Sequence, residues 1–312
     1  MSLSGRIRGR LQDWSIAVRP HTLPASVAPV FVGVSLAVHE GVFHSQTAAA
    51  AFLVAMLLQV AVNLANDYYD FRSGVDDSNQ GFERACASGR IQPHRVKLAV
   101  WIVLFLSVIP GAYLAIFGGL PLIIAGVLSL LAAVGYSGGP YPYGSYALGD
   151  LSVFLFFGIV ATAGTYYVQY CASLNLLFPL SVPPGAITVS SVSLAVVPGS
   201  LSTAILVINN LRDREGDAEA GKVTLAVLLG RMGSIVEFVF LLFLSYLVPV
   251  TLYLYDFSVW VLLPLFSLPL AISIITELLR TSAPSRMNHQ LVRTGRLLLI
   301  HSLLLGAGIL FS

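Results

Sequence analysis

Two Asn and two Asp residues in the segment 63–70 have the types and the spacing to bind a cation. They are Asn63, Asn66, Asp67 and Asp70. Their separations of three and four residues would place them on one face of a helix. Carboxylates stacked in this way repel one another, and a divalent cation removes that cost. Because the ligands are all oxygens, the pattern favours Mg²⁺, which also binds phosphate oxygens.

A second stretch repeats this arrangement. Asn209, Asp213 and Asp217 follow one another at four-residue spacing. The pattern Asn-x-x-x-Asp therefore occurs twice, as Asn63/Asp67 and as Asn209/Asp213. If the two stretches face each other, they form a site for a diphosphate held through two Mg²⁺, and nearby basic residues would bind its outer oxygens. Solvated loops with surface ion pairs are the alternative, and the repetition favours the site. The basic residues nearest to the stretches are Arg72, Arg212, Arg214 and Lys222.

The elements that must position these residues are membrane helices. Of 312 residues, 56% are hydrophobic and only 10% are charged, with a mean hydropathy of +0.83. A soluble domain carries about a quarter charged residues, so a soluble globular protein is excluded. The net charge of +2 gives no reason to expect a nucleic-acid partner. We therefore expect an all-α, polytopic membrane protein, surrounded by lipid, with residues 1–312 forming a single domain.

Nine apolar segments approach the length of about 20 residues that a bilayer crossing requires. A tight hairpin at Gly118-Gly119 separates the third segment from the fourth, because one unbroken helix there would be about twice a crossing. The predicted spans are Leu23–Val42, Thr47–Asn66, Val96–Phe117, Leu120–Tyr136, Leu148–Tyr170, Ile187–Leu211, Met232–Tyr255, Ser258–Leu279 and Gly295–Phe311.

The basic residues predict the orientation of these spans. All 17 of them precede the first span or follow the second, sixth and eighth spans, in the connections or at the very start of the next span. Basic residues gather on the cytoplasmic side of a membrane. We therefore expect a cytoplasmic N-terminus, an outside C-terminus and a site facing the cytoplasm, in a plasma membrane. The basic segment 1–20 is expected to be either an interfacial amphipathic helix or a disordered tail.

Several segments, in this order along residues 19 to about 230, resemble the UbiA superfamily of intramembrane aromatic prenyltransferases. The finer resemblance is to its branch that prenylates 1,4-dihydroxy-2-naphthoate. One departure is Phe82, which stands where the branch usually has Pro. The resembling segments are Arg19-Pro-x-Thr22-Leu-Pro24, Asn63-Leu-Ala-Asn-Asp-Tyr-x-Asp70 with Gly74-x-Asp76, Pro140-Tyr-Pro-Tyr-Gly144, Leu148-Gly-Asp150 and Asn209-Asn-Leu-Arg-Asp213 running on to Gly221-Lys222.

The resemblance implies a UbiA-like helical bundle in which carboxylates hold two Mg²⁺ on the diphosphate of a polyprenyl donor. The carboxylates so implied are Asp67, Asp70, Asp213 and Asp217. Further residues would bind the diphosphate or support these ligands, and they are Arg72, Lys222, Arg84, Asn63, Asn66 and Asn210.

The reaction implied is transfer of the polyprenyl group to 1,4-dihydroxy-2-naphthoate with loss of CO₂ and diphosphate, which gives demethylmenaquinol in menaquinone biosynthesis. Candidate residues of the acceptor pocket are Tyr141, Tyr143, Asp76 and Asp150. The two tyrosines either line that pocket or shape a turn, and Asp150 either orients a ligand or caps the fifth span. Asp76 is either a metal ligand or a gate residue.

Two alternatives remain. In the first, the same fold prenylates another aromatic acceptor, such as 4-hydroxybenzoate or homogentisate. This alternative stays open because the pocket shape that selects the acceptor is not visible in the sequence. The other is a cation-coupled membrane transporter. A transporter would be expected to carry charged groups near the bilayer midplane, whereas these acids gather at helix ends.

Overall fold

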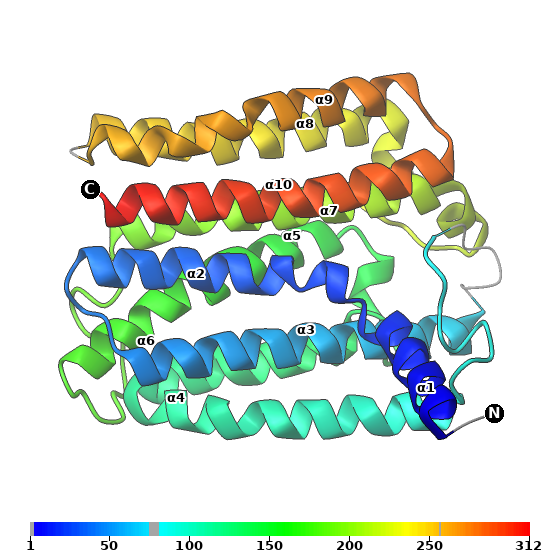
Figure 1. Ribbon diagram of the computed structural model, residues 1–312, viewed down its shortest axis with the longest axis horizontal. Coiled ribbons are helices and arrows are strands. Elements are labelled where there is room, and N and C mark those ends of the chain that lie inside the picture. The colour runs from blue at the N-terminus through cyan, green and yellow to red at the C-terminus, as the bar shows by residue number, and fades with distance from the viewer. Residues whose placement is uncertain (1–2, 75–80, 256) are drawn as a thin grey trace.

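The computed structural model describes residues 3–74, 81–255 and 257–312, and in this part of the chain it is all-helical, without strands. The long helices run side by side, and the N- and C-termini lie at opposite ends of the bundle (Figure 1). The longer helices are α1 (Leu3–Val18), α2 (Pro24–His39), α3 (Ser45–Ser73), α4 (Pro93–Gly135), α7 (Val189–Glu219), α8 (Leu225–Leu254), α9 (Leu268–Arg280) and α10 (Pro284–Leu310). The shorter ones are η1 (Pro20–Thr22), η3 (Tyr143–Ser145), α5 (Gly149–Val153), η4 (Phe154–Ala163), α6 (Gly164–Ser173) and η5 (Val259–Ser267).

The predicted hairpin within α4 is confirmed. Gly119 has φ 57° and ψ −150°, a conformation that is essentially restricted to glycine. Val96 and Ala133, near the two ends of α4, belong to one hydrophobic cluster, so the chain folds back between them. A Cβ on Gly119 would lie 1.9 Å from the carbonyl oxygen of Pro179. The two arms of α4 therefore lie antiparallel against α3.

Seven helices of the described chain are long and apolar enough to cross a membrane, or eight if the bent pair Leu11–Thr22 and Pro24–His39 is one span. These counts take α4 as one helix, and its two arms together with the other elements give the nine apolar segments expected from the sequence. The number of crossings and the sidedness of the termini stay predictions.

Several helices are longer than the predicted spans, and two of them carry the site residues in their additional turns. The second span, expected to end at Asn66, continues as α3 to Ser73, and the sixth, expected to end at Leu211, continues as α7 to Glu219. The last begins at Pro284, well before Gly295. Hydropathy reports only the lipid-embedded length of a helix, whereas hydrogen bonding carries these helices on into the polar region. Both acidic stretches are therefore helical.

The N-terminal segment forms the helix α1, which agrees with the predicted amphipathic helix rather than with the disordered tail. Ala17 of α1 is buried in the same cluster as Leu64 of α3. The fifth span is continuous but changes its winding, because α5 passes into the π-helical η4 before α6. Gly158 of η4 lies against α7, where an added Cβ would be 2.7 Å from the carbonyl oxygen of Ala195.

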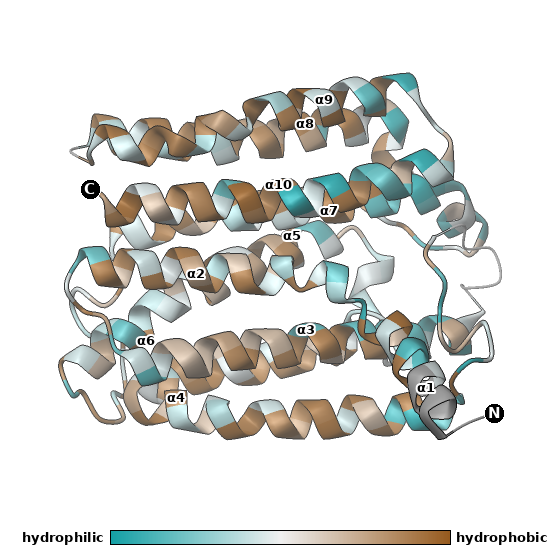
Figure 2. Cartoon of the chain, viewed as in Figure 1, coloured by the Kyte–Doolittle hydropathy of each residue, from teal (hydrophilic) through white to brown (hydrophobic). Residues whose placement is uncertain are grey.

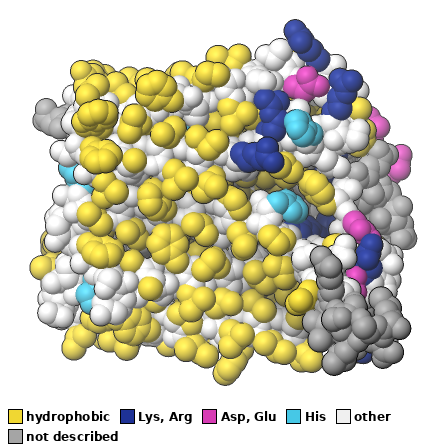
Figure 3. All heavy atoms as spheres, viewed as in Figure 1, with side chains coloured by type: hydrophobic (Ala, Val, Ile, Leu, Met, Phe, Trp, Pro, Cys, Tyr) yellow, Lys and Arg dark blue, Asp and Glu magenta, His cyan; other side chains and the backbone are white. Residues whose placement is uncertain are grey.

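Polar and apolar residues are separated along the bundle. Hydrophilic residues concentrate at the end that carries the N-terminus and the last turns of α3 and α7, and the rest of each helix is mainly hydrophobic (Figure 2). On the visible face, Lys, Arg, Asp and Glu side chains gather at this same end (Figure 3). Large side chains such as Phe105, Leu131 and Phe266 are exposed. This apolar outer surface suits lipid contact, and the charged end suits the membrane boundary.

Candidate active site at the polar end of the bundle

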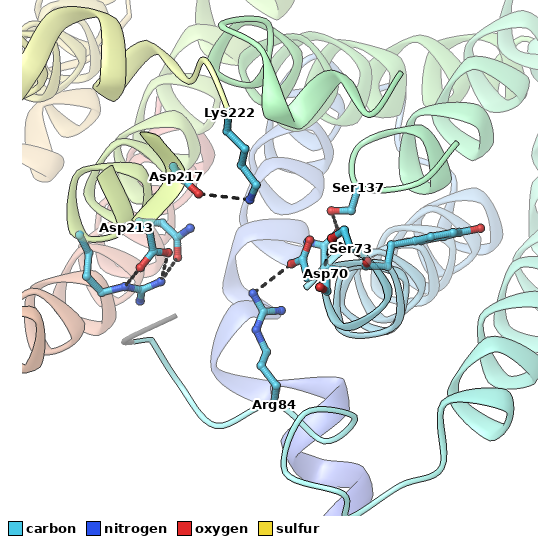
Figure 4. A network of polar contacts seen from close by, with 11 residues as sticks. Asp70, Ser73, Arg84, Ser137, Asp213, Asp217 and Lys222 are labelled. Atoms are coloured by element: carbon cyan, nitrogen blue, oxygen red, sulfur yellow. Dashed lines mark hydrogen bonds and ion pairs between the residues drawn. The ribbon is translucent and has the colours of Figure 1, made fainter. Parts of the chain in front are cut away.

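A cavity of about 770 Å³ opens at the polar end, and we call it the polar cavity. Its walls come from the ends of α3 and α7, the loop containing Arg84, and the connections that follow α4 and α7. Asp70 lies on one side, and Asp213 and Asp217 lie on the other (Figure 4). Arg84 and Lys222 point into the space between these sides (Figure 4). The structure thus brings both predicted acidic stretches to one cavity.

On the α3 side, Arg84 is the partner of Asp70. The guanidinium Nη2 lies 3.2 Å from Oδ2 of Asp70, and both side chains are mostly buried. Asn66 accepts a hydrogen bond of 2.8 Å from the hydroxyl of Ser137, which lines the cavity. The helix ends at Gly74, whose φ of 73° forms a left-handed cap. The last turn of α3 is thereby held against the connection that follows α4.

On the α7 side, Arg212 binds Asp213 through two contacts. Its Nε lies 2.7 Å from Oδ1 and its Nη2 lies 2.5 Å from Oδ2. The same guanidinium donates to Oδ1 of Asn209 at 2.9 Å and to Oδ1 of Asn288 in α10 at 2.7 Å. Asn210, the predicted diphosphate ligand, is buried and also lines the cavity. Arg212 fixes the direction of the Asp213 carboxylate.

Lys222 is brought to the cavity by the turn that ends α7. Gly221 has a φ of 75°, and the backbone N–H of Lys222 donates to the carbonyl oxygen of Asp217 at 2.8 Å. The Lys222 ammonium lies 3.2 Å from Oδ1 of Asp217. Val223 then pairs with the connection after α4, where its N–H donates to Ser145. These contacts keep the lysine between the two acidic sides.

Asp67 is not among the residues that line the polar cavity. Its residue surface is fully buried, and its carboxylate faces the charges of Arg19 and Arg84 and the backbone N–H groups of Ala85 and Cys86. Asp67 lies about one helical turn before Asp70 on the same side of α3, and at that level the N-terminal segment and the loop 81–91 cover the helix. A buried carboxylate at this place is suited to positioning the side chains of Arg19 and Arg84.

Two more predicted diphosphate ligands lie away from the polar cavity. The amide of Asn63 donates to the carbonyl oxygen of Val18 at 2.7 Å and to the hydroxyl of Thr22 at 2.8 Å, so it ties α3 to the N-terminal segment. Arg72 is exposed and donates to the hydroxyl of Tyr68 at 3.3 Å. Asn63 lies about two turns before Asp70 on the same face, where the N-terminal segment covers it, whereas Arg72 is two residues after Asp70 and lies on another side of the helix.

The donor set of the polar cavity fits Mg²⁺ in chemistry. Asp70, Asp213, Asp217 and the amide of Asn210 offer oxygen ligands from two sides. In the described part of the chain, no group of three or more His, Cys, Asp or Glu side chains is gathered closely enough to hold a metal ion by itself. The separation suits an ion that takes its remaining ligands from water and from an anion lying between the two sides.

A second cavity of about 380 Å³ has mainly apolar walls, and we call it the apolar cavity. It extends among α2, α3, both arms of α4, η4, α6 and α7. Tyr136 and Asn209 line both cavities, so the two are adjacent at these residues. Phe156 and Phe157 add aromatic walls. A ligand with a charged head and an apolar tail matches this pair of cavities.

The predicted acceptor residues are placed differently from one another. Tyr143 lines the apolar cavity and its hydroxyl donates to the carbonyl oxygen of Ala132 at 2.9 Å. Tyr141 is 79% exposed and lines neither cavity. Asp150 is buried in the first turn of α5 and lines neither cavity, and the N-cap of α5 is Leu148 without a side-chain cap hydrogen bond, so neither predicted role of Asp150 is confirmed. Asp76 lies outside the described residues.

The sequence analysis missed Tyr136, which ends the second arm of α4. Its ring packs edge-on against that of Tyr143, with centroids 5.5 Å apart. Burial raises the pKa of the Tyr143 phenol. In the sequence, Tyr136 is only the last residue of the fourth predicted span, where tyrosine is a common interface residue. Only the folded chain reveals its place between the cavities.

Comparison with known proteins identifies the family. The model of the UbiA prenyltransferase family matches residues 26–302. The chain belongs to this family. It is an integral membrane protein, as the family and its apolar helices require. It is 36% identical over 97% of its length to the 1,4-dihydroxy-2-naphthoate octaprenyltransferase of Escherichia coli, of which it covers 96%. It is 40% identical over 70% of its length to the enzyme of the same name from Mycobacterium tuberculosis, of which it covers 70%.

Solved structures support the same fold for this UbiA family member. The apo structure of a UbiA homologue from Aeropyrum pernix K1 matches 93% of this chain and 97% of its own, with a TM-score of 0.65 and 15% identity. The structure of a UbiA homologue from Archaeoglobus fulgidus bound to DMAPP and Mg²⁺ matches 94% and 99%, with a TM-score of 0.52 and 14% identity. The UbiA-like helical bundle expected from the sequence is confirmed.

Proposed function

We propose that this protein transfers a polyprenyl group from polyprenyl diphosphate to 1,4-dihydroxy-2-naphthoate, with loss of diphosphate and CO₂, and so forms demethylmenaquinol for menaquinone biosynthesis. The observation that carries the proposal is the adjacency of a charged polar cavity and an aromatic-lined apolar cavity at Tyr136 and Asn209. The names of the bacterial relatives support the reaction and the acceptor.

The donor diphosphate binds in the polar cavity. Arg84 and Lys222, now paired with Asp70 and Asp217, turn to the phosphate oxygens, and Arg212 keeps Asp213 directed at the cavity. Cations fixed in this way stabilise the negative charge that grows on the leaving diphosphate. Their carboxylate partners would then be available to hold Mg²⁺, which would compensate the carboxylate charge.

Asp70, Asp213 and Asp217, supported by Asn210, are the residues that would hold Mg²⁺, and we propose two ions. When bound, Mg²⁺ would neutralise negative charge on the diphosphate as the diphosphate leaves. The donor and Mg²⁺ named for the Archaeoglobus structure agree with this assignment. Asp67 serves this site by holding Arg19 and Arg84 in position.

The apolar cavity excludes water from the allylic cation that remains. The faces of aromatic rings tolerate positive charge, and Tyr136, Phe156 and Phe157 supply such walls. The neutral Tyr143 hydroxyl is hydrogen-bonded to Ala132 and orients its ring along the cavity. The electron-rich ring of the acceptor then attacks the cation from beside these walls.

The polar cavity faces the cytoplasm of a cell whose plasma membrane holds the protein. The basic residues support the cytoplasmic orientation, because they gather at the same end of the bundle as the cavity. A polyprenyl diphosphate suits this position, because its tail is soluble only in lipid and its charged head only at the membrane boundary.

The experiment that tests this function is an assay of the purified protein in nanodiscs. It contains a polyprenyl diphosphate, Mg²⁺ and 1,4-dihydroxy-2-naphthoate, with and without EDTA, and the product is followed by mass spectrometry. We expect a prenylated naphthol without the carboxylate, whose formation stops with EDTA and resumes when Mg²⁺ is restored.

Other outcomes would change the conclusion in different ways. Prenylation of 4-hydroxybenzoate or homogentisate, but not of the naphthoate, would contradict the proposed acceptor and leave the donor site in place. Undiminished turnover in EDTA would contradict the metal assignment. Failure of every acceptor, without release of diphosphate, would favour the transporter alternative.

A further inference from the structure

The helical glycines of this protein fall into two groups. In the first, the missing side chain lets two helices approach closely. A Cβ on Gly33 would lie 2.5 Å from the carbonyl oxygen of Thr162, and one on Gly308 would lie 2.2 Å from that of Trp260. A glycine inside a helix is less stable than alanine because it loses more backbone freedom on folding. Close packing of helices offsets that loss in this first group.

In the second group no such compensation exists, because nothing lies within 4 Å of a Cβ built on these glycines and none of them has a positive φ. Gly9 of α1 belongs to this group and lies outside both cavities. The other three, Gly111, Gly126 and Gly164, line the apolar cavity from the first arm of α4, the second arm of α4 and α6 respectively. They share the open space that they leave at the wall of this cavity, and Gly126 is exposed there.

The second arm of α4 shows how this space is arranged. Its cavity-lining residues recur every three or four positions from Leu122, near the hairpin, to Tyr136, beside the polar cavity. These end points are about 20 Å apart along a helix. Between them the lining residues all have small side chains or none, and they are Ala125, Gly126, Ser129, Ala132 and Ala133.

We infer that Gly111, Gly126 and Gly164 determine how long a prenyl tail the protein accepts. The inference rests on the proposed function and deepens it, because the occupant is the tail of the donor whose diphosphate lies in the polar cavity. Gly126 lies about 15 Å from Tyr136 along the arm. A short tail ends before Gly126, whereas a long tail has to pass it and needs the open wall there.

The test replaces Gly126 by a residue that fills the open space. In the variant Gly126→Leu, we expect kcat/KM for octaprenyl diphosphate to fall at least about tenfold, as it does when a pocket excludes part of a substrate. With geranyl diphosphate, kcat/KM should change by less than about threefold. The ratio of the two values is the measurement, and it cancels any loss of folded protein.

Two matched controls belong to this test. Val127 is the neighbour of Gly126, is 48% exposed and does not line the cavity, so Val127→Phe adds bulk outside and should leave the donor ratio unchanged. Gly126→Ala should raise the temperature of thermal unfolding, because the helix gains a better helix former without a clash. An equal fall with both donors in Gly126→Leu, or a changed ratio in Val127→Phe, would overturn the inference.

A binding measurement separates this inference from the proposed reaction. Thiodiphosphate analogues of the two donors are added to wild type and Gly126→Leu, and the rise in unfolding temperature is recorded. We expect the long analogue to stabilise only the wild type and the short one to stabilise both. If both bind but no acceptor is prenylated, the proposed function fails and the tail-length inference stands. If the long analogue stabilises Gly126→Leu as fully as wild type, or if neither analogue stabilises the wild type, the inference fails.

Discussion

At the scale of single residues, each carboxylate that lines the polar cavity in the described chain has a basic partner. The pairs are Asp70 with Arg84, Asp213 with Arg212, Glu215 with Arg214, and Asp217 with Lys222. In the proposed reaction, a diphosphate with its metal ions would enter by exchange of partners, with the basic residues turning to phosphate and the carboxylates to metal. Neither the basic residues nor the carboxylates would then be left with uncompensated charge in a partly buried site.

Asp217 and Asp67 are predicted to have different roles, because Asp217 faces the polar cavity and Asp67 faces two arginines. Asp217→Asn should lower turnover at least about 100-fold, because it removes charge from the metal and diphosphate site. It should change the free energy of unfolding by only about 1 kcal/mol, since Lys222 is partly exposed. Asp67→Asn should destabilise by about 3 kcal/mol, because Arg19 and Arg84 would lose the nearby opposite charge in a buried place.

Thermal unfolding in detergent and turnover per folded protein measure these two effects. Glu219→Gln is the control, because Glu219 is exposed near the end of α7 and does not line the polar cavity. A larger loss of turnover in Asp67→Asn than in Asp217→Asn would contradict the positioning role of Asp67 and return it to the metal ligands.

At the scale of elements, the site depends on helices that continue beyond the membrane. The last turns of α3 and α7 carry Asp70, Asp213 and Asp217 past the apolar region, and spacing on these helices decides which acids face the cavity. The hairpin of α4 has a matching role for the apolar cavity, because both of its arms line it. The turn at Gly119 therefore has to be sharp.

This turn gives the prediction at the element scale. Gly119→Ala should destabilise the protein by about 3 kcal/mol, because alanine disfavours the backbone conformation and its Cβ would meet Pro179. Thermal unfolding is the measurement, with Gly126→Ala as the matched control in the same element. An unfolding temperature of Gly119→Ala equal to that of the wild type would contradict the hairpin geometry.

At the scale of the whole molecule, charge and hydropathy orient the bundle. The N- and C-termini lie at opposite ends, and the charged end holds the polar cavity (Figures 1 and 3). Positive residues stay on the cytoplasmic side of a membrane. The distribution of charge therefore predicts an orientation with the C-terminus outside and the cavity inside.

Cysteine labelling tests this orientation. The native Cys86 and Cys171 are both buried, and replacing them by Ala provides a background without thiols. In intact cells, a membrane-impermeant maleimide should label Ser312→Cys at once and Glu219→Cys only after the membrane is permeabilised. The reverse pattern would place the polar cavity outside, and labelling of both in intact cells would contradict termini on opposite sides.

The sequence alone determined the class of fold and predicted the chemistry of a site. Hydropathy located the apolar segments and the hairpin at Gly118-Gly119, because each depends only on local composition and on one residue type. Spacing predicted two acidic helix faces for the same reason, one with Asn63, Asn66, Asp67 and Asp70 and one with Asn209, Asp213 and Asp217. The family resemblance then indicated the donor and the reaction, which the chain's membership of the UbiA family supports.

Only the tertiary structure decided which side chains meet. Asp67 and Asp70 have the same chemistry in sequence, yet one is enclosed by the N-terminal segment and the other faces the polar cavity. Arg72 and Tyr141 are directed outward, whereas Tyr136 joins the two cavities. Local spacing fixes the face of a helix on which a residue lies, but what covers that face depends on packing with segments far along the chain. The open glycines of the apolar cavity have the same explanation, because an empty space is a property of several helices together.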